Sequence, residues 1–127
     1  MSTLVIQSHR DPLPHPWLAT CMRSVQQWTK TQAYGYRFID EDSFFALDKL
    51  IVTRYKSRPV ILSDFARLLS LQACLNEGFD RVIWLDSDTL ILNLDDFRPL
   101  SGEFVVGREH WLQRDLSGEY RIYTKVH

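Results

Sequence analysis

Two aspartates flank a serine directly after the most apolar short segment of the chain. The run Arg81–Leu85 is apolar, β-branched and aromatic, which predicts a central parallel strand covered on both faces. Asp86 and Asp88 follow at once, and carboxylates this close repel each other and are costly to desolvate. A hard divalent cation such as Mg²⁺ or Mn²⁺ removes that cost, because it prefers carboxylate oxygens. The place after a strand favours a metal site, although an Asp-x-Asp in an ordinary loop is a solvated acidic turn.

The segment before this strand adds an acid and a cation one helical turn apart. Residues Pro59–Asn76 predict a long helix that Gly78 ends, and Asp64 and Arg67 lie three positions apart on one face of it. One interpretation is a surface ion pair, which contributes less than about 1 kcal/mol. The other is an acid that holds a ribose or base beside a cation that meets phosphate. The residues alone leave both interpretations open.

Polar residues also follow two earlier predicted strands. Leu4–Ile6 precedes Gln7-Ser8-His9, and Tyr36–Ile39 precedes Asp40-Glu41-Asp42. In open α/β sheets, ligands bind beyond the carboxyl ends of the strands. We therefore expect these residues to meet the two aspartates at one edge of the sheet. The Asp40–Asp42 segment fits a helix N-terminus equally well.

The order of the predicted elements indicates an α/β fold with a doubly wound, mainly parallel sheet flanked by helices. Pro16 opens a helix that Gly35 is expected to end, and its apolar residues recur at helical spacing. We also expect a partly helical segment over Ser43–Tyr55. The remaining expectations are strands over Glu103–Val106 and Glu119–Tyr123, core positions for Trp17, Trp28 and Trp84, and a broad apolar helix stripe of Ile61, Phe65, Leu68, Leu69, Leu71 and Leu75.

The composition limits the class of protein. The chain has 127 residues, 15 Lys and Arg against 16 Asp and Glu, and 45% hydrophobic residues. We expect one domain over residues 1–127 with a real core, and neither disorder nor bulk electrostatic binding of nucleic acid. No apolar run is long enough to cross a membrane, and the N-terminus lacks a signal peptide pattern. Cys21 and Cys74 are expected to be buried and reduced, which fits the cytoplasm.

The stretch from Arg58 to Phe97 resembles nucleotide-sugar glycosyltransferases of the GT-A fold. The resemblance is carried by Ser63-Asp64-x-x-Arg67-Leu68 and by Val82 to Leu90, which contains Asp86-Ser87-Asp88. It is closest to the retaining galactosyl and glucosyl branch, glycosyltransferase family 8, and to related enzymes with a DXD sugar-binding region. It implies a Rossmann-like GT-A fold.

The resemblance also implies roles for individual residues. Asp86 and Asp88 would hold Mn²⁺ or Mg²⁺ on the diphosphate of a nucleotide-sugar donor, a UDP-sugar in most of that branch. Asp88 would contact the metal most directly, and Asp86 would contact metal and ribose. Ser87 lies between them in the donor site. Arg67 would lie near the diphosphate or donor sugar, with Asp64 as the acid one turn earlier, and His9 would touch the nucleotide.

Transfer to a hydroxyl of a sugar, lipid-linked or protein acceptor would complete the family's reaction. The family's acceptor half, including a late metal-binding histidine, normally lies further along the chain than this one extends past Asp88. We therefore expect a donor-binding domain whose acceptor part is missing. His110 and His127 are the late histidines, and no catalytic acid or nucleophile is assigned.

Two alternatives stay open. The first is a non-catalytic GT-A-like domain that binds nucleotide or serves as an assembly module, with exposed edges that favour homo-oligomers. The second is an aspartate-dependent phosphatase, whose motif also begins Asp-x-Asp. That motif requires Thr or Val two residues after the second acid, whereas in this chain Thr89 comes one position too early.

Overall fold

The computed structural model describes residues 1–99 and 101–126, and it divides the chain into two compact units. The first unit is Met1–Phe97 and the second is Arg98–His127. Each is described by itself here. The expected single domain over residues 1–127 stays a prediction.

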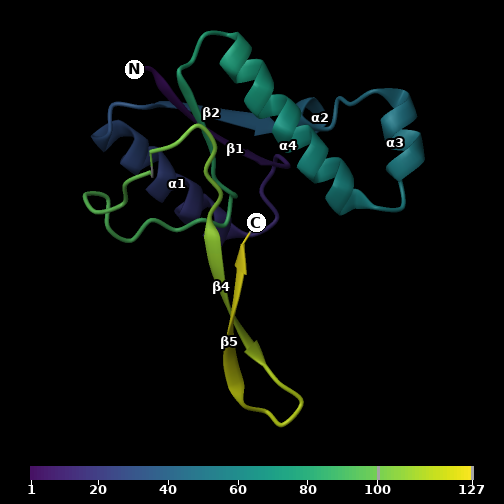
Figure 1. Ribbon diagram of the computed structural model, residues 1–127, viewed down its shortest axis with the longest axis vertical. Helices are drawn as coiled ribbons and strands as arrows, with labels where there is room; N and C mark the ends of the chain where they lie inside the picture. The colour runs from purple at the N-terminus through teal and green to yellow at the C-terminus, as the bar shows by residue number, and fades with distance from the viewer. Residues whose placement is uncertain (100, 127) are drawn as a thin grey trace. The chain divides into compact units, whose positions relative to one another are not determined.

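The first unit is built on a three-stranded parallel sheet in the order β2-β1-β3 (Figure 1). The strands are β1 (Thr3–His9), β2 (Gly35–Asp40) and β3 (Arg81–Trp84), and all three were expected. The prediction that the third strand is central is wrong, because β1 lies between the other two. Five of the seven β1 residues are buried, whereas every β3 residue is only partly buried.

Helices lie on both faces of this sheet. On one face, Val5 packs with Val25 and Trp28 of α1 (Pro16–Thr31). On the other face, Leu4 and Ile6 pack with Cys74 of α4 (Pro59–Asn76). This division follows from strand geometry, since successive side chains point to opposite faces. The α/β class and a parallel sheet flanked by helices are therefore confirmed.

The end of α1 corrects two expectations. Gly35 does not end the helix but begins β2, where an added Cβ would lie 3.1 Å from Cδ1 of Leu4. The chain turns instead at Ala33, which has a φ of 55°. Trp17 is not in the core: it is 53% exposed and stacks on His15 in the preceding loop. Trp28 is fully buried, as expected.

Between β2 and α4 the chain forms two short helices, α2 (Glu41–Phe44) and α3 (Lys49–Tyr55). Asp40 caps the first, because its carboxylate accepts hydrogen bonds from the backbone N–H and the hydroxyl of Ser43. These bonds favour the charged form and lower the pKa of Asp40. The N-terminal interpretation of Asp40–Asp42 is thus confirmed for its first residue.

Helix α4 has the predicted bounds but a different buried face. Only Ala66 and Cys74 of this helix are buried. Much of the expected apolar stripe is exposed, including Ile61, Leu68, Leu69 and Leu75. The sheet beneath α4 has three strands, and Cys74 and Leu71 are the α4 residues that pack into its cluster, so apolar side chains on the other sides of the helix stay exposed.

The second unit contains one antiparallel pair, β4 (Arg108–Arg114) and β5 (Tyr120–Val126). The strand expected over Glu119–Tyr123 overlaps β5. The strand expected over Glu103–Val106 is wrong, because that apolar segment forms no strand. Within the described residues, no helix is long and apolar enough to cross a membrane.

Acid should weaken the first unit through three paired carboxylates. Ser2 donates from its backbone N–H and hydroxyl to Asp80, Arg37 donates two hydrogen bonds to Glu77, and Ser43 donates to Asp40. These bonds lower the pKa of each acid in the folded state. Their stabilisation is present above the ordinary carboxylate pKa, about 4, and is lost as pH falls through the lower folded-state values.

We expect the urea midpoint of Asp80→Asn to lie below that of the unmodified chain at pH 7, and the gap to narrow at about pH 3. Asp95→Asn is the matched control, because the Asp95 side chain makes no polar contact within the described residues. A gap for Asp80→Asn that stays constant with pH would contradict this account.

Candidate functional site

A cavity of about 570 Å³ lies at the carboxyl ends of β1 and β3. The chain leaves β1 toward β2 on one side and later returns to β3 on the other, and such a reversal of strand order opens a crevice where ligands bind. The walls come from the segments after β1 and β3 and from α1, α2 and α4. Residues that line it include Ser8, His9, Trp17, Glu41, Phe44, Ser63, Arg67, Trp84, Asp86, Ser87 and Asp88.

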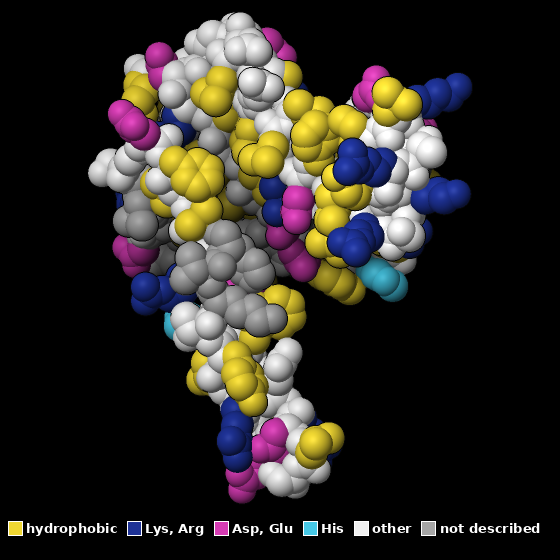
Figure 2. Space-filling model, turned by 45° about the vertical axis from the view of Figure 1, so that its right-hand side comes forward, with side chains coloured by type: hydrophobic (Ala, Val, Ile, Leu, Met, Phe, Trp, Pro, Cys, Tyr) yellow, Lys and Arg dark blue, Asp and Glu magenta, His cyan; other side chains and the backbone are white. Residues whose placement is uncertain are grey.

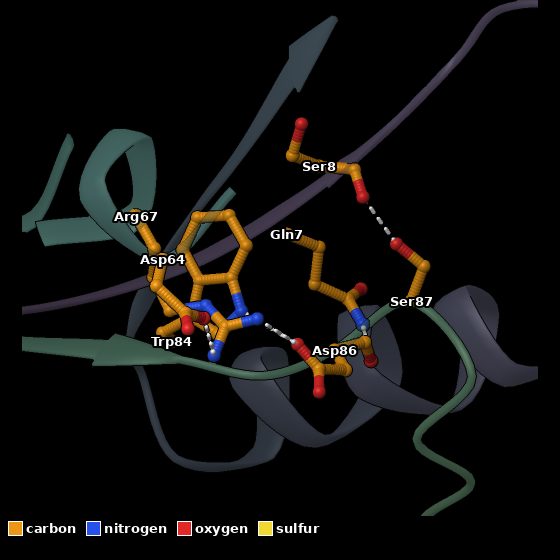
Figure 3. A network of polar contacts seen from close by, with 7 residues as sticks. All are labelled: Gln7, Ser8, Asp64, Arg67, Trp84, Asp86 and Ser87. Atoms are coloured by element: carbon orange, nitrogen blue, oxygen red, sulfur yellow. Dashed lines mark hydrogen bonds and ion pairs between the residues drawn. The ribbon is translucent and has the colours of Figure 1, made fainter. Parts of the chain in front are cut away.

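The Asp86 carboxylate is held by two side chains (Figure 3). Its Oδ1 accepts a hydrogen bond from Nε1 of Trp84 at 2.8 Å and forms an ion pair with Arg67 at 3.2 Å. The Arg67 guanidinium also lies 5.2 Å above the Trp84 ring. One carboxylate oxygen is thus engaged by the protein, and the nearby positive charge offsets its negative charge.

The backbone around Asp86 is held by β1. Gln7 is fully buried and donates from Nε2 to the Asp86 carbonyl at 3.0 Å, while its Oε1 accepts from the hydroxyl of Tyr36 at 3.2 Å. Ser87 is also buried, and its hydroxyl donates to the Ser8 carbonyl. These bonds fix the motif to the central strand. Figure 3 shows them joining the segment after β3 to Gln7 and Ser8.

Asp88 is in a different environment from Asp86. Both are exposed and line the cavity, but Asp88 makes no hydrogen bond or ion pair in the part of the chain that the structure describes. Its carboxylate is therefore available to a ligand. The two acids of the motif differ accordingly: the first is oriented by protein contacts and the second faces solvent.

The remaining predicted site residues divide into two groups. His9 lines the cavity, and its Nδ1 accepts a hydrogen bond from the backbone of Arg10. Asp64 is not among the lining residues and joins the site only through Arg67, at 3.7 Å. His110 belongs to the second unit, and His127 lies outside the described residues.

Sequence reasoning missed the roles of Gln7 and Trp84. Gln7 was noted only as a polar residue after a strand, but it lies within β1 with its side chain fully buried. The signal that could have identified it is its place directly after the apolar run Leu4–Ile6, where a strand that continues by one residue buries the amide, and buried amides require partners. Trp84 was expected in the core, yet it is partly exposed, and its indole N–H donates a hydrogen bond to the Asp86 carboxylate.

The acidic side chains of the cavity determine which kind of divalent metal site it could form. The described residues contain no group of three or more His, Cys, Asp or Glu side chains that could hold a metal ion. Asp86 and Asp88 offer two carboxylates, and Mg²⁺ commonly takes one or two while water and substrate phosphates fill the other positions. The residues therefore fit a cation that arrives with a phosphate-bearing ligand. They do not make a complete protein cage.

Comparisons with models of protein families, with curated proteins and with solved structures found no match to this chain. The chemistry of the cavity is therefore the basis for a functional proposal.

Removing the Gln7 amide should destabilise the first unit and release the Asp86 backbone. We expect Gln7→Met to lower the free energy of unfolding by about 1–3 kcal/mol, because the Asp86 carbonyl and the Tyr36 hydroxyl lose their partner in part-buried surroundings. Urea denaturation measures the effect. Tyr36→Phe is the matched control, since it removes only the second bond and should cost less. Equal stability of Gln7→Met and the unmodified chain would contradict this role.

Proposed function

We propose that the chain binds a nucleotide-sugar through its diphosphate and transfers the sugar to an acceptor hydroxyl, as GT-A glycosyltransferases do. The observation that carries the proposal is the pair of acids at the end of β3. Asp86 is oriented by Arg67 and Trp84, and Asp88 faces the cavity without a protein partner in the described part of the chain.

Asp86, Asp88 and Arg67 would have different roles in binding the metal ion and the diphosphate. Asp88 and the second oxygen of Asp86 would ligate Mn²⁺ or Mg²⁺, and the bound cation would neutralise charge on the diphosphate leaving group. Arg67 would keep Asp86 in place and offer charged N–H donors to a phosphate oxygen. Its Nε is buried and has no hydrogen-bond partner within the described residues, so the protein does not saturate this guanidinium.

The other walls suit the rest of a nucleotide-sugar. Trp17, which is 53% exposed, and the partly exposed Trp84 line the cavity and present apolar surface on which a base or sugar ring can stack, and the buried Phe44 packs against Trp84. His9 and Ser8 offer polar groups on the same wall as β1. The volume, about 570 Å³, lies in the ordinary range for small-molecule sites. These features support a donor site larger than a phosphate subsite alone.

The finer parts of the proposal that follow from the resemblance are a Rossmann-like GT-A fold, a UDP-sugar donor and a sugar, lipid-linked or protein acceptor. Action in the cytoplasm follows instead from the sparse cysteines, Cys21 and Cys74, which we propose to be reduced. The alternative is a domain that binds nucleotide without transferring sugar. Release of UDP from a UDP-sugar in the presence of candidate acceptors separates the two.

Binding of UDP should depend on a divalent cation and on Asp88. We expect calorimetric titration with Mn²⁺ to show binding that EDTA abolishes and that Asp88→Asn weakens at least roughly tenfold, the scale of losses at metal sites. Asp95→Asn is the control, because it removes the same charge from the same unit outside the cavity. UDP binding that survives EDTA or is unchanged in Asp88→Asn would refute the proposed site.

The contribution of Arg67 should appear only with phosphate-bearing ligands. We expect Arg67→Gln to weaken UDP binding by roughly ten- to a hundredfold, the value of a charged hydrogen bond of about 1.5–3 kcal/mol. Uridine binding should change little. Arg23→Gln on the exposed side of α1 is the control for net charge. If Arg67→Gln weakened uridine and UDP binding equally, Arg67 would have a structural role in the site and would not contact the diphosphate.

A further inference from the structure

Helix α3 and the start of α4 carry exposed apolar and basic side chains that do not line the cavity. This surface, called here the basic-apolar patch, comprises Lys49, Leu50, Arg54, Lys56, Arg58 and Val60. Leu50 is 80% exposed and Val60 is 71% exposed. Figure 2 shows dark blue basic side chains beside yellow hydrophobic ones on the side of the molecule that carries α3.

The charged side chains of the patch itself are all basic, although the exposed acids Asp48 and Asp64 border it in the sequence. No acidic residue occurs from Lys49 to Ser63, a stretch with four basic residues. Arg37, Arg67 and Arg121 each pair with a carboxylate. In contrast, none of the four basic side chains of the patch forms an ion pair within the described residues. The four basic side chains of the patch therefore have no acidic partner among the described residues, and Arg54 lies over the ring of Tyr55, although the whole chain has a net charge of −1.

Burial within the first unit does not account for these apolar residues. No residue of α3 is buried, and this helix packs against α4. Leu50 and Val60 thus face water at a cost that is recovered only when another apolar phase covers them.

We infer that the basic-apolar patch docks on an anionic lipid surface. Apolar side chains that enter the boundary of headgroups and acyl chains, ringed by lysines and arginines that meet lipid phosphates, are the elements of interfacial membrane binding. Nucleic acid would use the cations but not Leu50 and Val60, and the net charge of the chain does not favour it. This inference goes beyond the proposed function and does not depend on it.

Docking would also affect the cavity, because both share α4. Ser63 and Arg67 line the cavity and follow Val60 by one and two helical turns. A lipid surface at the start of α4 therefore lies near the wall that carries Arg67.

Sedimentation with vesicles tests the inference. We expect the chain to bind vesicles of phosphatidylcholine with about one third phosphatidylserine, to ignore phosphatidylcholine alone, and to dissociate in high salt. Lys49→Gln/Lys56→Gln should weaken partitioning roughly 25-fold, at about fivefold per cation. Arg23→Gln/Lys30→Gln is the matched control, since it removes the same charge from exposed positions of α1 and should change partitioning far less.

Leu50→Ser/Val60→Ser tests the apolar component, and we expect it to weaken binding to the same anionic vesicles roughly tenfold. Circular dichroism and urea midpoints check that the variants fold. Absence of binding to anionic vesicles by the unmodified chain would overturn the inference, as would equal losses in the α1 control. A dimer in solution that Leu50→Ser/Val60→Ser dissociates, without vesicle binding, would assign the patch to contacts between copies. Capture by polyglutamate without vesicle binding would assign it to an acidic protein.

Discussion

The hydrogen bond from Gln7 to the carbonyl of Asp86 is the contact on which the site depends. Gln7 lies in the central strand, where a buried amide must find partners. It finds one in the loop after β3 and another in the hydroxyl of Tyr36 from β2. One side chain therefore links β1 to Tyr36, near the start of β2, and to the loop after β3. Without it, the segment after β3 would keep its bonds from Leu85 to Ile6 and from Ser87 to Ser8 but would lose the one that fixes the Asp86 carbonyl.

The two acids of that motif resolve their mutual repulsion by different means. Asp86 is stabilised internally, by an ion pair with Arg67 and a hydrogen bond from Trp84. Asp88 is stabilised by water, because it is exposed and unpaired in the described part of the chain. This division leaves one carboxylate for a ligand. It also explains why no complete metal cage is needed for a cation that arrives with phosphate oxygens.

The elements that sequence reasoning predicted well have strong local signals. Pro59 and Gly78 mark both ends of α4, and the latter adopts a φ of 101° as the helix terminates. The three parallel strands followed from short apolar runs. Strand order did not, because a run such as Val82–Leu85 has the same composition at the centre or at the edge of a sheet. Composition also led to the wrong prediction of a strand over Glu103–Val106. The polar strand β4 has no alternation of apolar and polar residues that a local rule would identify.

For the site, the acids and Arg67 could be predicted because their types and spacing carry chemistry. Their positioning residues could not, since Gln7 is distant from Asp86 in sequence and only the sheet brings them together. Trp17 was predicted wrongly. Its helical spacing placed it on the apolar face of α1, but it lies in the first turn of that helix, where it is exposed and lines the cavity.

Helix α4 connects these observations, because its faces meet three different environments. Cys74 packs against the sheet, Ser63 and Arg67 line the cavity, and Val60 is exposed beside basic residues. A helix with only one buried stripe would show a single apolar face and polar residues elsewhere. The broad apolar stripe that was read as core is instead divided between a narrow contact with the sheet and exposed surface. That excess of exposed apolar area on the helix that also carries Arg67 makes α4 the element through which a surface contact could act on the cavity.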